Sequence, residues 1–372
     1  MIFFRSGRGW FITGNGPLTG EDGHALTERD TPTAKLRLAY ARRLTGDEVD
    51  EPANEADPTL LIICQEYLSY CESHDSSKTY YSRAGTLFDF CFGLPASLRN
   101  KQLSKQEREA KRIHAGFGRL RASQLKRLHV DRWIAAHPKW KGCRPTRIQA
   151  LKRALNYCAE AGLIPANLIM GYKVAKQRQR RTYLTPEQEA ACYKYANPAL
   201  AMAMKVCIRT GARYGCEFAK LTARHVTFTD KGMEWRFNEE ESKTGRLRII
   251  RIPNSEPVAR DVIEIVKSQM KKYPVGPIFR NTRGRPWRQK HLGYAFTELR
   301  KRLANHGIEL DGDSCMYMLR HTYAKRTLAG FWTGKPCTIE RLAELMGNTR
   351  EVCWDHYASW CEAYTDPLWE SA

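Results

Sequence analysis

The chain combines long stretches of helical apolar spacing with a few short strand-like runs. Between residues 59 and 172, apolar positions recur every three or four residues, as at Leu60, Leu61 and Cys64, which predicts an all-helical segment. Two short apolar runs, MEWRF at 233–237 and LRIIRI at 247–252, instead predict strands. Further helices are predicted at residues 261–270, 289–305, 319–329, 339–346 and 353–360. The pattern therefore predicts a mainly α chain in which the second half, 185–372, is an α+β domain with a small sheet.

A small separate unit is predicted at residues 1–50. Apolar runs containing Phe3, Phe4 and Trp10 flank glycine-rich turns, and GNG at 14–16 is a hairpin signal. A short basic helix is predicted at 33–44. This pattern favours either a β-hairpin and helix that form an arm-type DNA-binding module or a truncated remnant of one.

Two segments are predicted to be linkers. Residues 51–58 are acidic and contain proline. The second linker is residues 173–184, whose first part, KVAKQRQRR at 173–181, is nearly free of apolar side chains and strongly basic, which favours a tether that lies along DNA. The candidate DNA contacts in this second linker are Lys173, Lys176, Arg178, Arg180 and Arg181. Thr185 then begins a new helix as its N-cap, with Pro186 at the first helical position.

The charge of the chain indicates a polyanionic partner. Its 61 Lys and Arg against 40 Asp and Glu give a net charge of +21, and nucleic acid and a membrane surface are the two partners that such an excess favours. No run of about 18 apolar residues is present, so no membrane span is predicted and a membrane is not expected as a partner, which leaves nucleic acid. The 12 cysteines form no CxxC pair, which argues against a zinc ribbon and favours reduced thiols in the cytoplasm. No metal or other cofactor is expected.

The basic residues are concentrated in the helical half. Residues 99–153 contain 17 Lys and Arg and 3 Asp and Glu, a local surplus of +14. Because this surplus is lopsided and interleaved with Trp133, His137 and Trp140, we interpret it as a phosphate-contacting face rather than a solvated one. Arg144 and Arg147 are further candidate DNA contacts.

Four short strings in the second half carry the remaining chemistry. They are TGAR at 210–213, KTGR at 243–246, LRHTYA at 319–324 and LMGN at 345–348, and Tyr357 follows the last of them by nine residues. Each string alone is weak, since a TGxR string can enter any helix and a KTG turn can be an ordinary hairpin tip. In this order and spacing they resemble the catalytic domain of the tyrosine recombinase (phage integrase) family over residues 185–365. The preceding helical segment resembles that family's core-binding domain.

The chemistry of DNA cleavage agrees with this resemblance. A tyrosine oxygen attacks phosphorus only when cationic groups favour loss of its proton, and arginine forks stabilise the charge that develops on phosphate. The resemblance assigns Arg213 and Arg320 to the scissile phosphate, Lys243 to general acid and Tyr357 to the nucleophile. The energy of the phosphodiester is retained in the phosphotyrosine link, so the reaction requires neither ATP nor a metal.

Other residues of these strings are given supporting roles. The resemblance places Glu217 on a helix where it supports the first arginine, and it makes His321 a structural hydrogen-bonding group rather than a proton carrier. Three positions depart from the family pattern. Tyr317 stands where the family has histidine, Asn348 stands where it has histidine or tryptophan, and Cys216 takes the place of the acid, which indicates a one-residue insertion before Glu217. We expect Asn348 still to donate to a phosphate oxygen.

The implied function is site-specific recombination of double-stranded DNA by a homotetramer in a bacterial, nucleoid-associated setting. Accessory DNA-bending or directionality factors are possible partners. The apolar tail after Tyr357 fits either a neighbouring subunit or its own domain. Three other functions remain open: an integrase-fold DNA-binding protein that no longer cuts, a type IB topoisomerase that relaxes DNA, and a basic RNA-binding protein.

Overall fold

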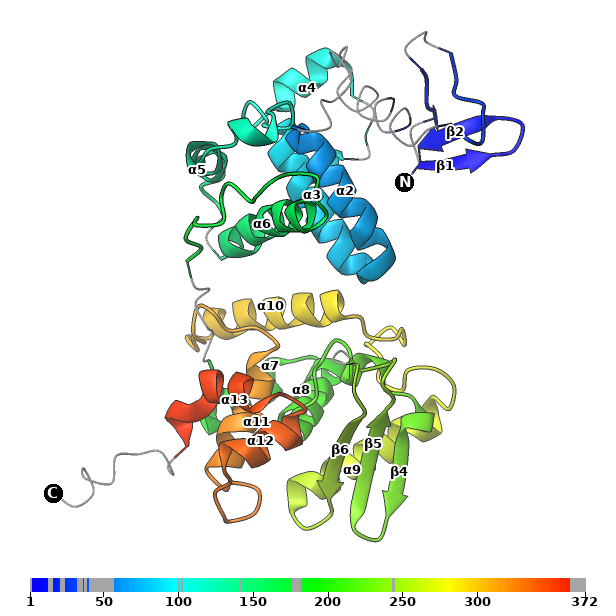
Figure 1. Cartoon of the computed structure of the whole chain (residues 1–372). Coiled ribbons are helices and arrows are strands. Elements are labelled where there is room, and N and C mark those ends of the chain that lie inside the picture. The colour runs from blue at the N-terminus through cyan, green and yellow to red at the C-terminus, as the bar shows by residue number, and fades with distance from the viewer. Residues whose placement is uncertain are drawn as a thin grey trace, which may run out of the picture. The chain divides into compact units, whose positions relative to one another are not determined.

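The computed structural model describes residues 2–12, 16–20, 24–31, 36, 39, 57–99, 101, 103–140, 142–175, 182–242 and 245–361. Its contacts divide the chain into two compact units, Met1–Arg178 and Gln179–Ala372 (Figure 1). Each unit contains its own hydrophobic core. The prediction of a mainly α chain with small sheets is confirmed.

A three-stranded antiparallel sheet begins the first unit. It consists of β1 (Ile2–Arg5), β2 (Gly9–Ile12) and β3 (Gly16–Pro17). The turn between β1 and β2 places Gly7 and Gly9 at positive φ, where glycine has no Cβ penalty. The predicted turn at residues 14–15, and all of the predicted helix 33–44 except Leu36 and Ala39, lie outside the described residues.

Five α-helices follow among the described residues from 57 to 175. They are α2 (Leu60–His74), α3 (Ser77–Phe92), α4 (Lys105–Lys111), α5 (Arg127–Ala135) and α6 (Arg144–Glu160). Helices α2, α3 and α6 pack against one another, and Trp133 of α5 is fully buried in the same core. His137 is also buried, and Trp140 packs on this core. Burial in this core accounts for Trp133 and His137, so these two residues do not support the predicted phosphate-contacting face.

A buried polar network ties three segments of this unit together around Asp89. The Asp89 carboxylate accepts a 2.6 Å hydrogen bond from Trp133 Nε1 and lies 3.0 Å from His137 Nε2 and 3.5 Å from His114 Nε2. His114 Nδ1 accepts the Gly116 N–H, so its Nε2 carries the proton and faces the carboxylate as a donor rather than as a metal ligand. The network is therefore explained as a set of hydrogen bonds inside the core.

The second unit packs helices beside a second antiparallel sheet. Its sheet has the order β4 (Val226–Thr229), β5 (Gly232–Phe237) and β6 (Arg248–Pro253). Its helices are α7 (Pro186–Tyr195), α8 (Pro198–Thr210), α9 (Pro257–Lys272), α10 (Gln289–Asn305), α11 (Met318–Leu328), α12 (Ile339–Met346) and α13 (Arg350–Tyr357). Short 3-10 turns at Phe218–Lys220, Ala223–His225 and Ala358–Trp360 complete it. The residues after 361, including the predicted docking tail, lie outside the described part of the chain.

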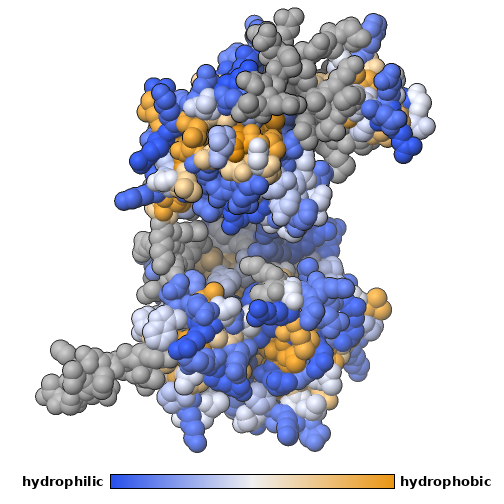
Figure 2. Space-filling model, in the orientation of Figure 1, coloured by the Kyte–Doolittle hydropathy of each residue, from blue (hydrophilic) through white to orange (hydrophobic). Residues whose placement is uncertain are grey.

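The surface agrees with the charged composition. The face in Figure 2 is predominantly hydrophilic in both units, with smaller apolar areas between the polar ones. Among the described residues, no helix is both long enough and apolar enough to cross a membrane.

Candidate active site

The first arginine of the site, Arg213, lies just after the end of α8. Gly211 ends that helix in the left-handed conformation, with φ of +62°. A Cβ at Gly211 would lie 2.4 Å from the Tyr323 ring, so only glycine lets the chain turn here against α11. The turn carries Arg213 into the interior, where it is 8% exposed.

The carboxylate of Glu217 holds Arg213 in place. It accepts the Arg213 backbone N–H at 2.7 Å and Nη1 at 2.5 Å. Residues 214–217 form a turn and a 3-10 helix begins only after Glu217, so the helix predicted to carry Glu217 is wrong. Phe218 and Ala219 donate to carbonyls five residues earlier, each at 3.2 Å. This wider turn brings the Glu217 carboxylate back to the arginine.

Arg320 enters the same region from the first turn of α11. It is 2% exposed, and its guanidinium donates to the carbonyl of Gly211 and, at 2.6 Å, to that of Met346. Arg320 Nη2 also donates to Asn348 Oδ1 at 3.1 Å. These neutral acceptors fix the guanidinium without cancelling its charge.

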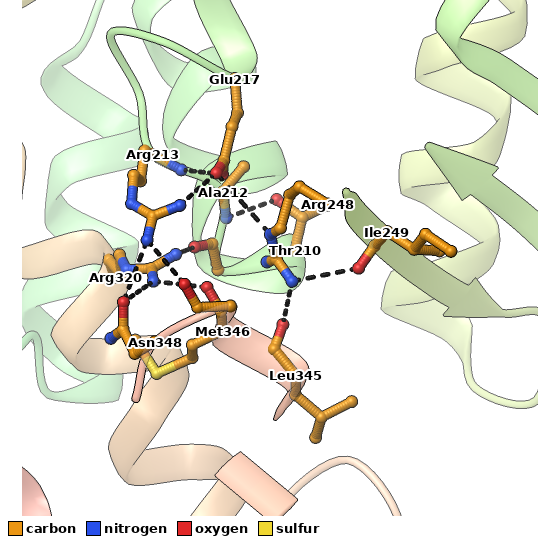
Figure 3. Close-up of polar contacts among 12 residues, drawn as sticks. Thr210, Ala212, Arg213, Glu217, Arg248, Ile249, Arg320, Leu345, Met346 and Asn348 are labelled. Atoms are coloured by element: carbon orange, nitrogen blue, oxygen red, sulfur yellow. Dashed lines mark hydrogen bonds and ion pairs between the residues drawn. The ribbon is translucent and has the colours of Figure 1, made fainter. Parts of the chain in front are cut away.

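Asn348 bridges the two arginines. Its Oδ1 accepts from Arg213 Nη2 at 3.0 Å and from Arg320 Nη2 at 3.1 Å (Figure 3). Because guanidinium groups only donate, the side-chain oxygen must face them. Gly347, which ends α12 with φ of +61°, supplies a further acceptor to Arg213 at 2.9 Å. In this conformation Asn348 accepts hydrogen bonds at the point where both forks converge.

A third buried guanidinium, that of Arg248 on β6, also belongs to the site and was not predicted from the sequence. Arg248 Nε lies 3.7 Å from Glu217 Oε1, and Nη1 donates to Ile249 and Leu345 carbonyls. Burial, together with the charges of Arg320 and Arg213, lowers its pKa to about 10 although Glu217 opposes this, so Arg248 remains cationic at neutral pH. The signal for it was available, since strand alternation places Arg248 on the same face as Ile250 and Ile252.

Tyr357 ends α13 and is almost fully enclosed. Its side chain is 2% exposed, and its hydroxyl lies 3.1 Å from His321 Nδ1. Burial raises the pKa of Tyr357 well above its usual value, while the positive charges of Arg320 and Arg213 act in the opposite direction. Burial also lowers the pKa of His321 to about 4. A neutral His321 therefore faces a protonated phenol at neutral pH.

The other predicted site residues differ in where they lie. Tyr317 caps α11, is partly exposed and lies edge-on to the His321 ring. Lys173 and Arg144 are exposed, whereas Arg147 donates to Thr86 and stacks on Trp140. Lys243, Lys176, Arg178, Arg180 and Arg181 lie outside the described residues.

Solved structures with a similar fold are integrases. A fragment of lambda integrase, solved as a dimer bound to a COC′ core site, is 16% identical with a TM-score of 0.59 over 82% of this chain and 96% of that chain. A variant Tn1549 transposon integrase in complex with a circular intermediate DNA is 14% identical, with a TM-score of 0.61 over 80% of this chain and 95% of that one. A lambda integrase tetramer bound to a Holliday junction is 15% identical, with a TM-score of 0.59 over 94% and 95% of the two chains.

The comparison with solved structures establishes the fold of this chain. No protein-family model matches the sequence, and no curated protein matches it either. The resemblance to tyrosine recombinases drawn from the four strings is confirmed at the level of fold.

Proposed function

We propose that this chain is a site-specific DNA recombinase of the integrase type that cleaves and rejoins strands through a covalent 3′-phosphotyrosine at Tyr357. The observation that carries the proposal is the convergence of Arg213 and Arg320 on Asn348 Oδ1. These three residues come from separate parts of the chain. Two guanidinium groups that share a single neutral acceptor form a site that a phosphate oxygen would occupy with a stronger, charge-assisted bond.

The charges around this point support phosphoryl transfer. The site holds three buried guanidinium groups, those of Arg213, Arg248 and Arg320. Among the described residues Glu217 is the one carboxylate that pairs with any of them, and it pairs with Arg213 and Arg248. The excess of positive charge suits a phosphodiester, and it suits still better the additional negative charge of the transition state. Because the positive charge is held in place before DNA binds, little reorganisation accompanies the reaction.

Tyr357 is the proposed nucleophile. Its hydroxyl gives up its proton to water as its oxygen attacks phosphorus, the bond to the 5′ oxygen breaks, and the 3′ phosphate becomes joined to the tyrosine. In the DNA-free chain the hydroxyl lies 3.1 Å from Nδ1 of neutral His321, and the positive charges of Arg320 and Arg213 favour the phenolate. Lys243 is proposed to give its proton to the leaving 5′ oxygen. Attack by the 5′ hydroxyl of another strand reverses these steps and rejoins the DNA.

The proposed substrate is double-stranded DNA carrying specific recombination sites. The exposed basic side chains of the helical unit, including Arg144, and the net charge of +21 support contact with the backbone. The similarly folded lambda integrase has been solved as a tetramer on a Holliday junction, and we propose the same assembly here. The first unit would then act as the core-binding domain and the second as the catalytic domain.

Covalent trapping tests the proposal. Purified protein is incubated, without metal or ATP, with nicked suicide duplexes that carry the genomic junctions flanking its own gene, and adducts are separated on a denaturing gel. Wild type should form an adduct, Tyr357→Phe should form none, and the matched control Tyr294→Phe, at an exposed tyrosine of α10, should behave as wild type. An adduct that persists in Tyr357→Phe would refute the assignment of the nucleophile.

A second function is favoured by the enclosure of Tyr357, which is 2% exposed. A phenol that stays buried and protonated would leave a protein that binds DNA without cutting it, as a repressor or accessory factor. Tight binding of the same duplexes with no adduct from wild type would establish this alternative. Relaxed circles without recombinant junctions would instead indicate a topoisomerase.

A further inference from the structure

Among the described residues of its unit, Arg248 has two buried donors without a hydrogen-bond partner, whereas Arg320 has one, its Nε. Arg248 lies at the inward-facing start of β6 and is 4% exposed. Nη1 donates to the carbonyls of Ile249 at 3.0 Å and Leu345 at 2.8 Å. Its Nε and Nη2 have no hydrogen-bond partner among the described residues. A buried arginine that served packing alone would be expected to have its donors satisfied, because each unpaired one costs free energy.

Arg248 contacts two parts of the proposed phosphate site, the Glu217 carboxylate and the end of α12. Glu217 Oε1 faces both arginines: it lies 3.7 Å from Arg248 Nε and 2.5 Å from Arg213 Nη1. Figure 3 shows the Glu217 carboxylate between the two guanidinium groups. The bond from Arg248 to the Leu345 carbonyl holds the last turn of α12, and Arg248 Cδ fills the space beside Gly347, where a Cβ would lie only 2.8 Å away. The Gly347 carbonyl in turn accepts from Arg213.

We propose that Arg248 is a positioning residue for strand cleavage, which shares the charge of Glu217 and ties the end of α12 to β6 so that Arg213 keeps its positive charge for the phosphate. The proposal rests on the proposed function. Without Arg248, the full charge of Glu217 would fall on Arg213, and the pair would become a neutral salt bridge beside the phosphate. Arg248 itself need not touch the DNA.

This role predicts a loss of rate rather than of binding. Removing the charge in Arg248→Met should slow single-turnover adduct formation by about 100-fold, the magnitude typical of removing one electrostatic contributor. Affinity for the duplex, measured by mobility shift, should change by less than about threefold, because most backbone contacts lie elsewhere. Arg251→Met is the matched control, since Arg251 lies on the same strand, is exposed and pairs with Glu234; it should cleave at the wild-type rate.

A double variant separates charge balance from structural support. Glu217→Gln in the Arg248→Met background removes the carboxylate that would neutralise Arg213, so it should recover at least about tenfold of the lost rate. Arg248→Lys keeps a cation near Glu217 and should cleave at a rate between those of wild type and Arg248→Met. Thermal unfolding verifies that each variant is folded, and Arg248→Lys replaces Arg248→Met in the comparison if the latter does not fold.

The outcomes distinguish this proposal from the one it rests on. If wild type forms no adduct, the proposed function fails and the role of Arg248 fails with it. If wild type forms an adduct and Arg248→Met matches its rate, the positioning role alone is overturned. A double variant slower than Arg248→Met would also overturn it, because that result means that Glu217 and Arg248 contribute only structural support.

Discussion

The buried imidazole of His321 should make the stability of the second unit depend on pH. Burial, with the positive charges of His356 and Arg320, lowers the pKa of His321 from 6.5 to about 4. As the pH falls, the unfolded chain therefore takes up a proton at this residue before the folded chain does. The contribution is fully present above about pH 6.5 and is lost progressively as the pH falls toward about 4.

The size of this effect follows from the two pKa values. Since one pKa unit corresponds to roughly 1.4 kcal/mol, the difference between 6.5 and about 4 removes about 3 kcal/mol once the pH is below both values. At pH 5 the expected loss is about 2 kcal/mol. His321 is almost fully buried, so solvent screening reduces this figure little.

Urea unfolding at pH 7 and pH 5 measures the loss. His321→Asn keeps an acceptor for the Tyr357 hydroxyl but cannot titrate in this range. Wild type should lose about 2 kcal/mol more free energy of unfolding between the two pH values than His321→Asn does. His291→Asn, at an exposed position of α10, is the matched control and should follow wild type. Equal losses in wild type and His321→Asn would show that burial of this imidazole does not control the pH response.

Two further substitutions test other parts of the structure. Gly347→Ala combines a positive φ with a Cβ 2.8 Å from Arg248 Cδ, so it should lower the free energy of unfolding by about 1–3 kcal/mol and slow adduct formation. Thermal unfolding and the trapping assay measure the two effects, and an unchanged transition would contradict the strain. Asp89→Asn leaves the donors of Trp133 and His137 poorly matched in the first unit and should cost about 3 kcal/mol, measured by urea unfolding. A loss below about 0.5 kcal/mol would show that the network contributes little to stability.

Elements with a strong apolar period and clear ends were predictable from the sequence. Helices α10 and α12 have the predicted bounds, Gln289–Asn305 and Ile339–Met346. Helix α12 has Thr338 as its N-cap and Gly347 in the left-handed conformation at its end, which are the usual start and stop signals. Helix α13 begins three residues before its prediction, at Arg350, because Thr349 caps it and local apolar spacing gave no sign of that boundary.

The elements and residues that were predicted wrongly share one cause: contacts that local apolar spacing does not reveal determine their local structure. Strand β4 was not predicted because little of it is buried, since only Val226 is even partly so. Its pairing with β5 is what makes it a strand. Glu217 lies on a turn rather than a helix because the backbone N–H groups of Phe218 and Ala219 bond to carbonyls five residues earlier rather than four. Trp133 and His137 stand among basic residues in the sequence, which favoured a phosphate-contacting interpretation. Their shared partner, Asp89, lies more than 40 positions earlier, so local spacing does not reveal it.

The pairing of buried arginines separates the proposed site from ordinary salt bridges in the same unit. Arg209 pairs with Glu256 and Arg326 with Glu189, one carboxylate to each guanidinium, so those charges are cancelled where they lie. Arg213 and Arg248 instead share the single carboxylate of Glu217, and Arg320 pairs with no carboxylate among the described residues. Their other bonds go to backbone carbonyls and, for Arg213 and Arg320, to the Asn348 amide oxygen. Neutral acceptors fix a guanidinium without neutralising it, so the fold carries the cost of an uncompensated charge before any ligand arrives. Such an arrangement lowers stability unless an anion binds, and it therefore argues for a phosphate site more strongly than the residue types alone.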